Sequence, residues 1–314
     1  MVNAQEWLDK NYPKEGECIR ETEDKISFLG EGWNNFGRTR GEIERLEISS
    51  QELEGKLELE RFTKLKDLKC SYNKLISLEI KSCPNLQVLI CNDNLLCELV
   101  INDCPNLKIL HCENNFLTEL DLSCNEKLED LILSDNDFSE KNLSFLSHLV
   151  NLYKLEIGNI MSWEEMNPDI FNCWVDSLKP LKNLTKLATL EINNTDIDSG
   201  LEYLPDSLAS FDCSADKRKD AKVKKLETEL RKYGEVREEG EFISLLRAWR
   251  VSLRREELTS LQEEREEVEI TLQQQKREKE QLEEALHQQN QEIEKLKAKL
   301  EKLQLQAQTQ VSPK

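Results

Sequence analysis

The side chains best suited to chemistry in this chain are ten cysteines and three histidines. Zinc sites need cysteine or histidine ligands at short, fixed spacings such as C-x-x-C. The sequence contains no C-x-x-C pair, and His111, His148 and His287 have no second ligand at such a spacing. We therefore expect neither a metal nor any other cofactor.

The cysteines follow a repeated pattern instead. Two sets recur about every 21 residues, in positions that other copies of the pattern fill with leucine or a small apolar residue. The first set is Cys70, Cys91 and Cys112, and the second set is Cys83, Cys104 and Cys124. Because a free cysteine behaves as a small apolar side chain, the pattern favours thiols packed in a core over disulfide bonds.

Catalytic constellations are also missing from the sequence. It contains no phosphate-binding loop, no dinucleotide fingerprint and no nucleophile–base–orienter set. His111 adjoins Cys112, but neighbours on a strand point to opposite faces, so these two side chains are not expected to form a catalytic pair. We expect a protein without enzymatic activity.

These residues are carried by a repeat of 21 residues. An apolar residue occupies its first, fourth, sixth and eleventh positions and asparagine its ninth, as in Leu65, Leu68, Cys70, Leu75 and Asn73. Regular copies begin at Leu65, Leu86, Leu107 and Leu128, and looser copies begin at Ile43, Leu152, Leu187 and Leu208.

The sixth copy departs from this spacing. Its start at Leu152 is followed by the next start only at Leu187, so an insertion is expected near residues 160–180, and the ninth position would fall on Ile160. The aromatic residues of the insertion are predicted to pack as a short helix or loop on one rim. They are Trp163, Phe171 and Trp174.

The template L-x-x-L-x-L-x-x-N-x-L resembles the leucine-rich repeat, in which each copy adds one short strand to a curved parallel sheet. In an extended segment Leu68 and Cys70 point inward and Lys69 points outward. Asn73 ends the strand, where its amide can bond to buried backbone groups of adjacent repeats. A second apolar half-period, beginning with Leu78, predicts that the return segments of the regular copies are also extended.

Longer phrases resemble a large family of soil-fungal leucine-rich-repeat proteins over residues 1–225. They are residues 3–13, the Leu-Lys-Cys and Cys-Pro-Asn-Leu phrases, residues 194–205 and residues 215–222. The resemblance implies an intracellular protein-binding module. Some similar proteins carry a protein kinase domain, but this sequence has no glycine-rich phosphate loop, H-R-D or D-F-G, so kinase activity does not carry over.

Charge is distributed unevenly along the chain, whose formal net charge is −19. Residues 43–216 hold 32 acidic and 15 basic residues, a net charge of −17. Such a field repels nucleic acids and anionic lipids and favours a protein ligand with a basic segment, although acidic residues also keep an elongated solenoid soluble.

The N-terminal residues are polar, so we expect no membrane insertion and a cytoplasmic location. The basic cluster 217–225 leaves nuclear import open, although the start of a charged helix explains it more simply.

The outward strand positions of the third to fifth copies give a candidate binding surface on the concave side. Four β-branched residues are expected to lie side by side there, bordered by the acidic residues Asp67, Glu113 and Asp130. The candidate protein-binding residues are Val88, Ile90, Ile109, His111, Glu113, Asp130 and Ile132. The competing interpretation is that β-branched residues merely favour strands.

After residue 216 the pattern changes to heptads, which predict a coiled coil over residues 256–305. Its apolar seam, at positions a and d, is Leu258, Leu261, Val268, Leu272, Leu282, Leu286, Ile293, Leu296, Leu300 and Leu303. Four polar residues interrupt the seam: Arg265, Gln275, Lys279 and Gln289. Parallel self-pairing would oppose Glu264 to Glu269 and Glu278 to Glu283, and both contacts are repulsive. Self-association is the leading prediction because one sequence offers no other partner, while heteromeric pairing, antiparallel pairing and a single solvated helix stay open.

The sequence thus predicts an α+β protein, a solenoid of short repeats followed by a long helical coiled coil. Its segments are an N-terminal cap (1–42), the repeats (43–216), a helical connector or C-terminal cap (217–255), the coiled coil (256–305) and a disordered tail (306–314). The predicted function is a protein-binding adaptor or scaffold that oligomerises through the coiled coil. The alternatives are a structural coiled-coil protein, cytoskeletal or tethering, and a regulatory subunit of an enzyme.

Overall fold

The computed structural model describes residues 2–20, 35–160, 170–218, 220–236 and 242–310. The chain divides into two compact units, Met1–Arg250 and Val251–Lys314.

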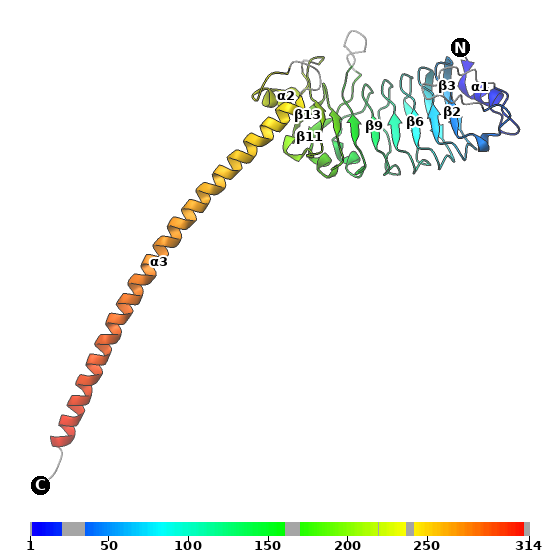
Figure 1. Ribbon diagram of the computed structural model, residues 1–314. Coiled ribbons are helices and arrows are strands. Elements are labelled where there is room, and N and C mark those ends of the chain that lie inside the picture. The colour runs from blue at the N-terminus through cyan, green and yellow to red at the C-terminus, as the bar shows by residue number, and fades with distance from the viewer. Residues whose placement is uncertain (1, 21–34, 161–169, 219, 237–241, 311–314) are drawn as a thin grey trace. The chain divides into compact units, whose positions relative to one another are not determined.

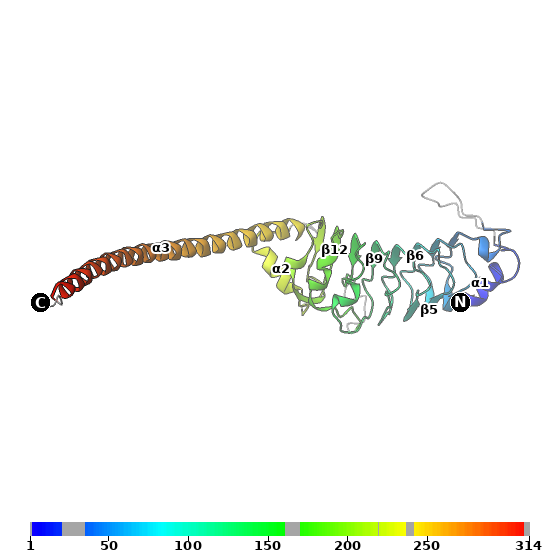
Figure 2. The same cartoon turned by 90° about the horizontal axis from the view of Figure 1, so that it is seen from below.

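The first unit is built on a parallel sheet of eight strands that follow one another in chain order (Figures 1 and 2). The strands are β2 (Arg45–Glu47), β4 (Asp67–Lys69), β6 (Val88–Ile90), β8 (Ile109–His111), β9 (Asp130–Ile132), β10 (Lys154–Glu156), β12 (Thr189–Glu191) and β14 (Ser210–Asp212). The middle residue of each strand, such as Leu89, is buried in one continuous apolar core. This confirms the predicted leucine-rich-repeat solenoid with turns of about 21 residues.

Asparagine closes each regular turn, as predicted. The Nδ2 group of Asn73 donates to the carbonyl oxygens of Cys70, in its own repeat, and Ile48, in the preceding one, both at 2.9 Å. Its Oδ1 accepts from the backbone N–H of Leu53 at 3.0 Å. Asn94, Asn115 and Asn136 repeat this arrangement. The amide ladder therefore satisfies buried backbone groups that water cannot reach.

Return segments of the first copies form strands of a second parallel sheet, which confirms the extended return at Leu78 and Leu99 but not at Leu120, where no strand forms. Its order is β1 (Val2–Asn3), β3 (Leu53–Leu59), β5 (Lys74–Ile80) and β7 (Glu98–Val100). The later copies, which begin at Leu128, Leu152 and Leu187, return through short 3₁₀ helices at Leu143–Leu146, Lys179–Asn183 and Leu201–Tyr203. Strands β11 (Val175–Ser177) and β13 (Asp196–Ser199) pair in a small separate sheet.

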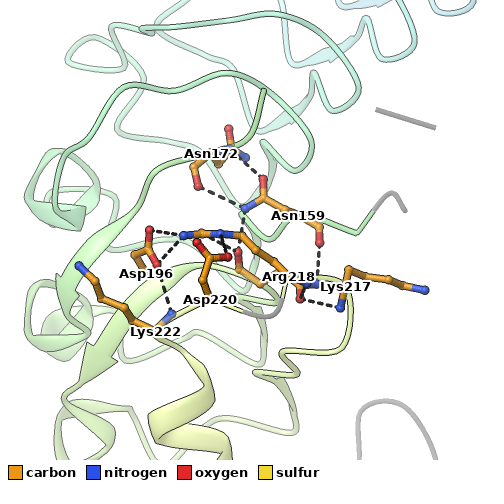
Figure 3. Close-up of polar contacts among 8 residues, drawn as sticks. Asn159, Asn172, Asp196, Lys217, Arg218, Asp220 and Lys222 are labelled. Atoms are coloured by element: carbon orange, nitrogen blue, oxygen red, sulfur yellow. Dashed lines mark hydrogen bonds and ion pairs between the residues drawn. The ribbon is translucent and has the colours of Figure 1, made fainter. Parts of the chain in front are cut away.

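The insertion in the sixth copy differs from the prediction. Ile160 does not fill the ninth position of the repeat, because Asn172, twelve residues further on, makes the ladder bonds to the carbonyl oxygens of Leu133 (2.9 Å) and Ile157 (3.3 Å). The backbone N–H of Asn172 donates to Asn159 Oδ1 at 2.8 Å (Figure 3). The insertion therefore lies between the strand and the asparagine, and the repeat resumes at residue 172 instead of 180.

The predicted rim packing of the aromatic residues is likewise corrected. Trp174 occupies the eleventh position of the repeat and is fully buried, because its ring replaces a core leucine and packs on Phe138 and Phe145. Its indole N–H donates to the Ile157 carbonyl oxygen at 2.8 Å. Phe171 is partly exposed, and Trp163 lies outside the described residues.

One cysteine assignment was wrong. Cys83 and Cys104 are buried, but Cys124 is exposed. The position 21 residues after Cys104 is Asn125, which is fully buried and donates to the Cys104 carbonyl oxygen at 3.0 Å. A polar residue that satisfies a backbone group has taken the place of the thiol.

Helical segments cover both ends of the repeat core. At the N-terminus lies α1 (Ala4–Asn11), in which the Asn3 side chain accepts from the Glu6 N–H and Leu8 is buried. A 3₁₀ turn at Arg40–Glu42 precedes β2. At the other end lie α2 (Lys224–Arg231) and the first turns of α3 (Phe242–Gln310), where Phe242 and Leu246 are buried in the core.

The second unit is the remainder of α3. Its described side chains from residue 254 onward are exposed. The helix continues to Gln310, past the predicted end of the rod at residue 305, because residues 306–310 contain no helix breaker. Residues 311–314 of the predicted tail lie outside the described part of the chain.

Candidate protein-binding surface

The outward side chains of the eight-stranded sheet form two parallel rows, together called the sheet face below. The strand register aligns the first residues of all strands in one row and the third residues in the other. The first row is Arg45, Asp67, Val88, Ile109, Asp130, Lys154, Thr189 and Ser210. The second row is Glu47, Lys69, Ile90, His111, Ile132, Glu156, Glu191 and Asp212.

The predicted apolar island is present in the first row and divided in the second. Val88 and Ile109 are direct neighbours and are partly exposed. Ile90 is also partly exposed, but His111 separates it from Ile132. Ile132 is only 8% exposed, because it lies between the longer side chains of His111 and Glu156, so it adds little surface. The expectation of four adjacent exposed aliphatic side chains is thus corrected to three.

A polar cluster stands beside this island. His111 Nε2 lies 3.3 Å from Asp130 Oδ2, close enough for an ion pair although outside hydrogen-bond geometry. The Tyr153 hydroxyl donates to the same oxygen at 3.4 Å. Burial raises the pKa of Tyr153, and the neighbouring Asp130 carboxylate raises it further. The other carboxylate oxygen, Asp130 Oδ1, is buried and has no hydrogen-bond partner among the described residues.

Two more unpartnered acceptors follow the strands. Glu113 and Ser134 occupy equivalent positions just after β8 and β9, and both Glu113 Oε2 and Ser134 Oγ are buried without a partner in the described part of the chain. Ser134 is 1% exposed. Burial raises the pKa of the Glu113 carboxyl above its ordinary value. Since an unpaired buried polar group costs about 1–3 kcal/mol, these oxygens suit a ligand that brings hydrogen-bond donors.

Further along the sheet face the surface becomes acidic. After Ile132 the second row continues as Glu156, Glu191 and Asp212. The last two line a groove of about 250 Å³, whose wall also includes Asn193 and Asp216. The sheet face therefore joins a small apolar area to a longer acidic one.

The strand register places Val88, Ile90, Ile109, His111, Asp130 and Ile132 on one face, as the sequence predicts, and Glu113 follows two residues after the end of β8. Two further residues of this surface, Tyr153 and Ser134, are not predicted from the sequence. Tyr153 was missed because it occupies the second position of the repeat, outside the strand. Ser134 is a small residue without a chemical signature, and only its burial reveals it.

The other chemical groups are inert or isolated. All ten cysteines are free, and burial raises the pKa of Cys83 and Cys104 to about 12. Within the described ranges no group of three His, Cys, Asp or Glu side chains is arranged to hold a metal ion. Nor does any helix in those ranges combine the length and the apolar character that a membrane span requires.

The predicted coiled-coil seam lies on α3 and is uncovered in the single chain. Its ten aliphatic side chains are between 47% and 71% exposed, with Ile293 the least and Leu282 the most exposed. An amphipathic helix of this length exposes far more apolar surface than a soluble monomer ordinarily does.

Comparison with known proteins finds similar solved structures but no matching family. No protein-family model matches the chain, and no curated protein matches it. Similar solved structures include an internalin C2 from Listeria monocytogenes, with 22% identity over 54% of this chain and 71% of that one, and a TM-score of 0.39. A leucine-rich-repeat protein of Leptospira interrogans has 21% identity over 60% of this chain and 52% of that one, with a TM-score of 0.40.

A third similar structure is the plant peptide hormone receptor RGFR1 in complex with RGF2. It has 18% identity over 54% of this chain and 31% of that one, with a TM-score of 0.39. The chain thus spans about half of the Leptospira protein and a third of the receptor. Likeness at this level concerns the fold alone. The 21-residue turns and the asparagine ladder of the chain itself define a leucine-rich-repeat solenoid.

Proposed function

We propose that this protein is a non-catalytic adaptor that binds a protein ligand on the sheet face and self-associates through α3. The observation that carries the first half is that the partly exposed side chains of Val88, Ile90 and Ile109 share one face with the unpartnered buried oxygens of Asp130 and Ser134. Apolar contact area supplies binding energy, and buried acceptors supply orientation and specificity.

The chemistry of the sheet face favours a basic ligand segment. Asp130 Oδ1, Glu113 Oε2 and Ser134 Oγ can all accept hydrogen bonds, and the guanidinium group of arginine carries five donors. Glu156 already pairs with Lys154 at 2.8 Å, and the next residues of the second row, Glu191 and Asp212, would attract further positive charge. We therefore expect an extended segment with an arginine next to apolar residues.

Selection from a random peptide display library against the full chain tests this proposal. We expect enriched peptides with an arginine adjacent to aliphatic or aromatic residues. The bait variant Ile90→Asp/Ile109→Asp should enrich none of them while keeping the wild-type circular dichroism and melting temperature. Asp130→Asn should keep the apolar preference and lose the arginine. Equal enrichment by wild type and the Ile90→Asp/Ile109→Asp variant would remove the sheet face as the binding site.

The second half of the proposal rests on the exposed seam of α3. A heptad seam of ten aliphatic residues is stable in water when a second helix covers it. One chain offers a copy of itself as the available partner, and a different protein is the alternative. Sedimentation of the full chain at about 50 μM, compared with Leu272→Asp/Leu282→Asp, should give a dimer for the wild type and a monomer for the variant.

Two other functions are tested by the same variants. A structural rod would keep its cellular partners when the sheet face is altered and lose them when the seam is altered, whereas an adaptor loses a different set with each variant. A regulatory subunit would co-purify with an enzyme.

An intracellular location is part of the proposal and is supported by ten cysteines without a disulfide bond.

A further inference from the structure

The polar residues in the α3 seam are placed symmetrically. Arg265 and Gln289 each lie 12 positions from Arg277, and Gln275 and Lys279 each lie 2 positions from it. The two cations occupy a positions and the two amides occupy d positions. Antiparallel coiled coils pair an a residue with a d residue, so this symmetry has a direct structural meaning.

An antiparallel pair of α3 helices centred on Arg277 matches every one of these residues. Arg265 then faces Gln289 of the second copy, and Lys279 faces Gln275 of the second copy. The amide oxygen of glutamine can accept from either cation. The remaining central layers are entirely aliphatic: Leu258 with Leu296, Leu261 with Ile293, Val268 with Leu286, and Leu272 with Leu282.

Other registers are worse. Sliding the antiparallel pair by one or two heptads places at least one cation opposite leucine, since no other shift aligns both cations with amides. In the centred register only Leu300 meets a charged residue, Arg254 of the second copy, whose aliphatic stem can cover it.

The parallel, in-register pair brings like charges together. Arg265 would face Arg265 and Lys279 would face Lys279 inside the seam, where they are partly removed from water. Glutamates flank the seam in both orientations, so their repulsion does not distinguish the two. Within one helix Arg265 pairs with Glu269 at 3.1 Å and Lys279 pairs with Glu283 at 3.7 Å, but only the parallel pair also brings two like cations into the same layer. The seam layers therefore decide the orientation.

We infer that α3 forms an antiparallel homodimer centred on Arg277. This inference rests on the proposed self-association and adds its orientation and register. Because an α-helix rises 1.5 Å per residue, the two copies of Val251 would stand about 80 Å apart, at opposite ends of the paired segment. Such a dimer would engage two well-separated ligand sites rather than one compact one.

Disulfide trapping distinguishes the orientations. Leu272→Cys and Leu282→Cys are made separately in the full chain, with the exposed Cys97 and Cys124 replaced by serine. Leu272 faces Leu282 in the antiparallel dimer, so oxidation should yield covalent dimers only when the two variants are mixed. A parallel dimer would give covalent dimers with each variant by itself, which overturns the inference. Gln274→Cys, which lies off the seam, mixed with Leu282→Cys is the matched control.

A charge variant gives a second, independent readout. Gln289→Glu places a carboxylate opposite Arg265 in the antiparallel dimer and should tighten self-association about fivefold, since it adds two ion pairs. In a parallel dimer it would oppose two glutamates and weaken the association. Gln288→Glu, with the same charge off the seam, should leave association nearly unchanged.

The possible results distinguish the antiparallel register from the self-association of α3 on which it rests. Covalent dimers from single variants, or weaker association of Gln289→Glu, would reject the antiparallel register while leaving self-association intact. A wild-type chain that sediments as a monomer at about 50 μM would reject self-association as well. Neither result bears on the ligand of the sheet face, which the peptide selection tests.

Discussion

Arg218 and Asp196 form a buried ion pair in the last repeats, in which one guanidinium nitrogen contacts both carboxylate oxygens. Arg218 Nη2 donates to Asp196 Oδ2 at 2.7 Å and to Oδ1 at 2.8 Å, and both residues are less than a tenth exposed (Figure 3). Arg218 occupies the eleventh position of its repeat, where the regular copies carry leucine. Its guanidinium carbon also lies 4.2 Å from the centre of the Phe171 ring. At this position a buried ion pair replaces the apolar side chain of the other repeats. Burial of each charge therefore depends on the presence of the opposite one.

Replacing Arg218 with leucine should therefore destabilise the fold, although leucine is the consensus residue of this position. The change leaves Asp196 buried without its partner, and breaking a buried pair in this way costs about 3 kcal/mol. Urea unfolding of Arg218→Leu should give that loss, and Asp196→Asn in the same chain should recover part of it. A leucine variant as stable as the wild type would mean that the pair contributes no net stabilisation.

Asn172 should behave as a member of the asparagine ladder despite its distance in sequence. Asn172→Ala removes donors from the carbonyl oxygens of Leu133 and Ile157 and leaves both buried oxygens without this donor. We expect a loss of about 2 kcal/mol in urea unfolding, similar to that of Asn136→Ala. The partly exposed Asn106, which donates to the Pro84 carbonyl oxygen at 2.7 Å, provides the control, and Asn106→Ala should cost less than about 0.5 kcal/mol. Equal losses at 106 and 172 would argue against the ladder role.

The regular repeats could be predicted because every determinant of their structure is local. Leu68, Cys70 and Asn73 lie within six residues, so spacing alone identifies the strand, the core and the turn. The asparagine of the sixth copy could not be predicted in this way, since Asn172 lies twelve residues beyond the position that the repeat spacing indicates. The burial of Ile132 and the role of Tyr153 depend on side chains from neighbouring repeats, which no single repeat specifies.

The buried Glu113 carboxyl gives the fold a pH-dependent weakness. Because burial raises its pKa, the native state holds this proton more tightly than the unfolded chain, so stability falls as the pH rises from the ordinary carboxyl pKa through the raised one. At pH 7, Glu113→Gln should raise the melting temperature by about 2 °C. Below about pH 4 the wild type and the variant should melt together.

The matched control for this prediction is Glu119→Gln, which removes the same charge from an exposed position of the same repeat. It should leave the melting temperature nearly unchanged across the range. A gain for Glu113→Gln that persists at low pH would attribute the effect to packing rather than to titration.

Thiol reactivity tests how the cysteines are divided between core and surface. Cys97 and Cys124 are exposed, Cys173 is half-buried, and the other seven are buried. Burial raises the pKa of Cys173 and raises that of Cys18 to about 11, so these thiols form little of the reactive thiolate. With an aromatic disulfide reagent near pH 8, we expect two thiols to react rapidly in the native protein and all ten in urea. Cys97→Ser/Cys124→Ser should abolish the rapid phase. Rapid loss of Cys70, Cys91 or Cys112 would instead mean that the regular repeats open far more readily than their continuous core allows.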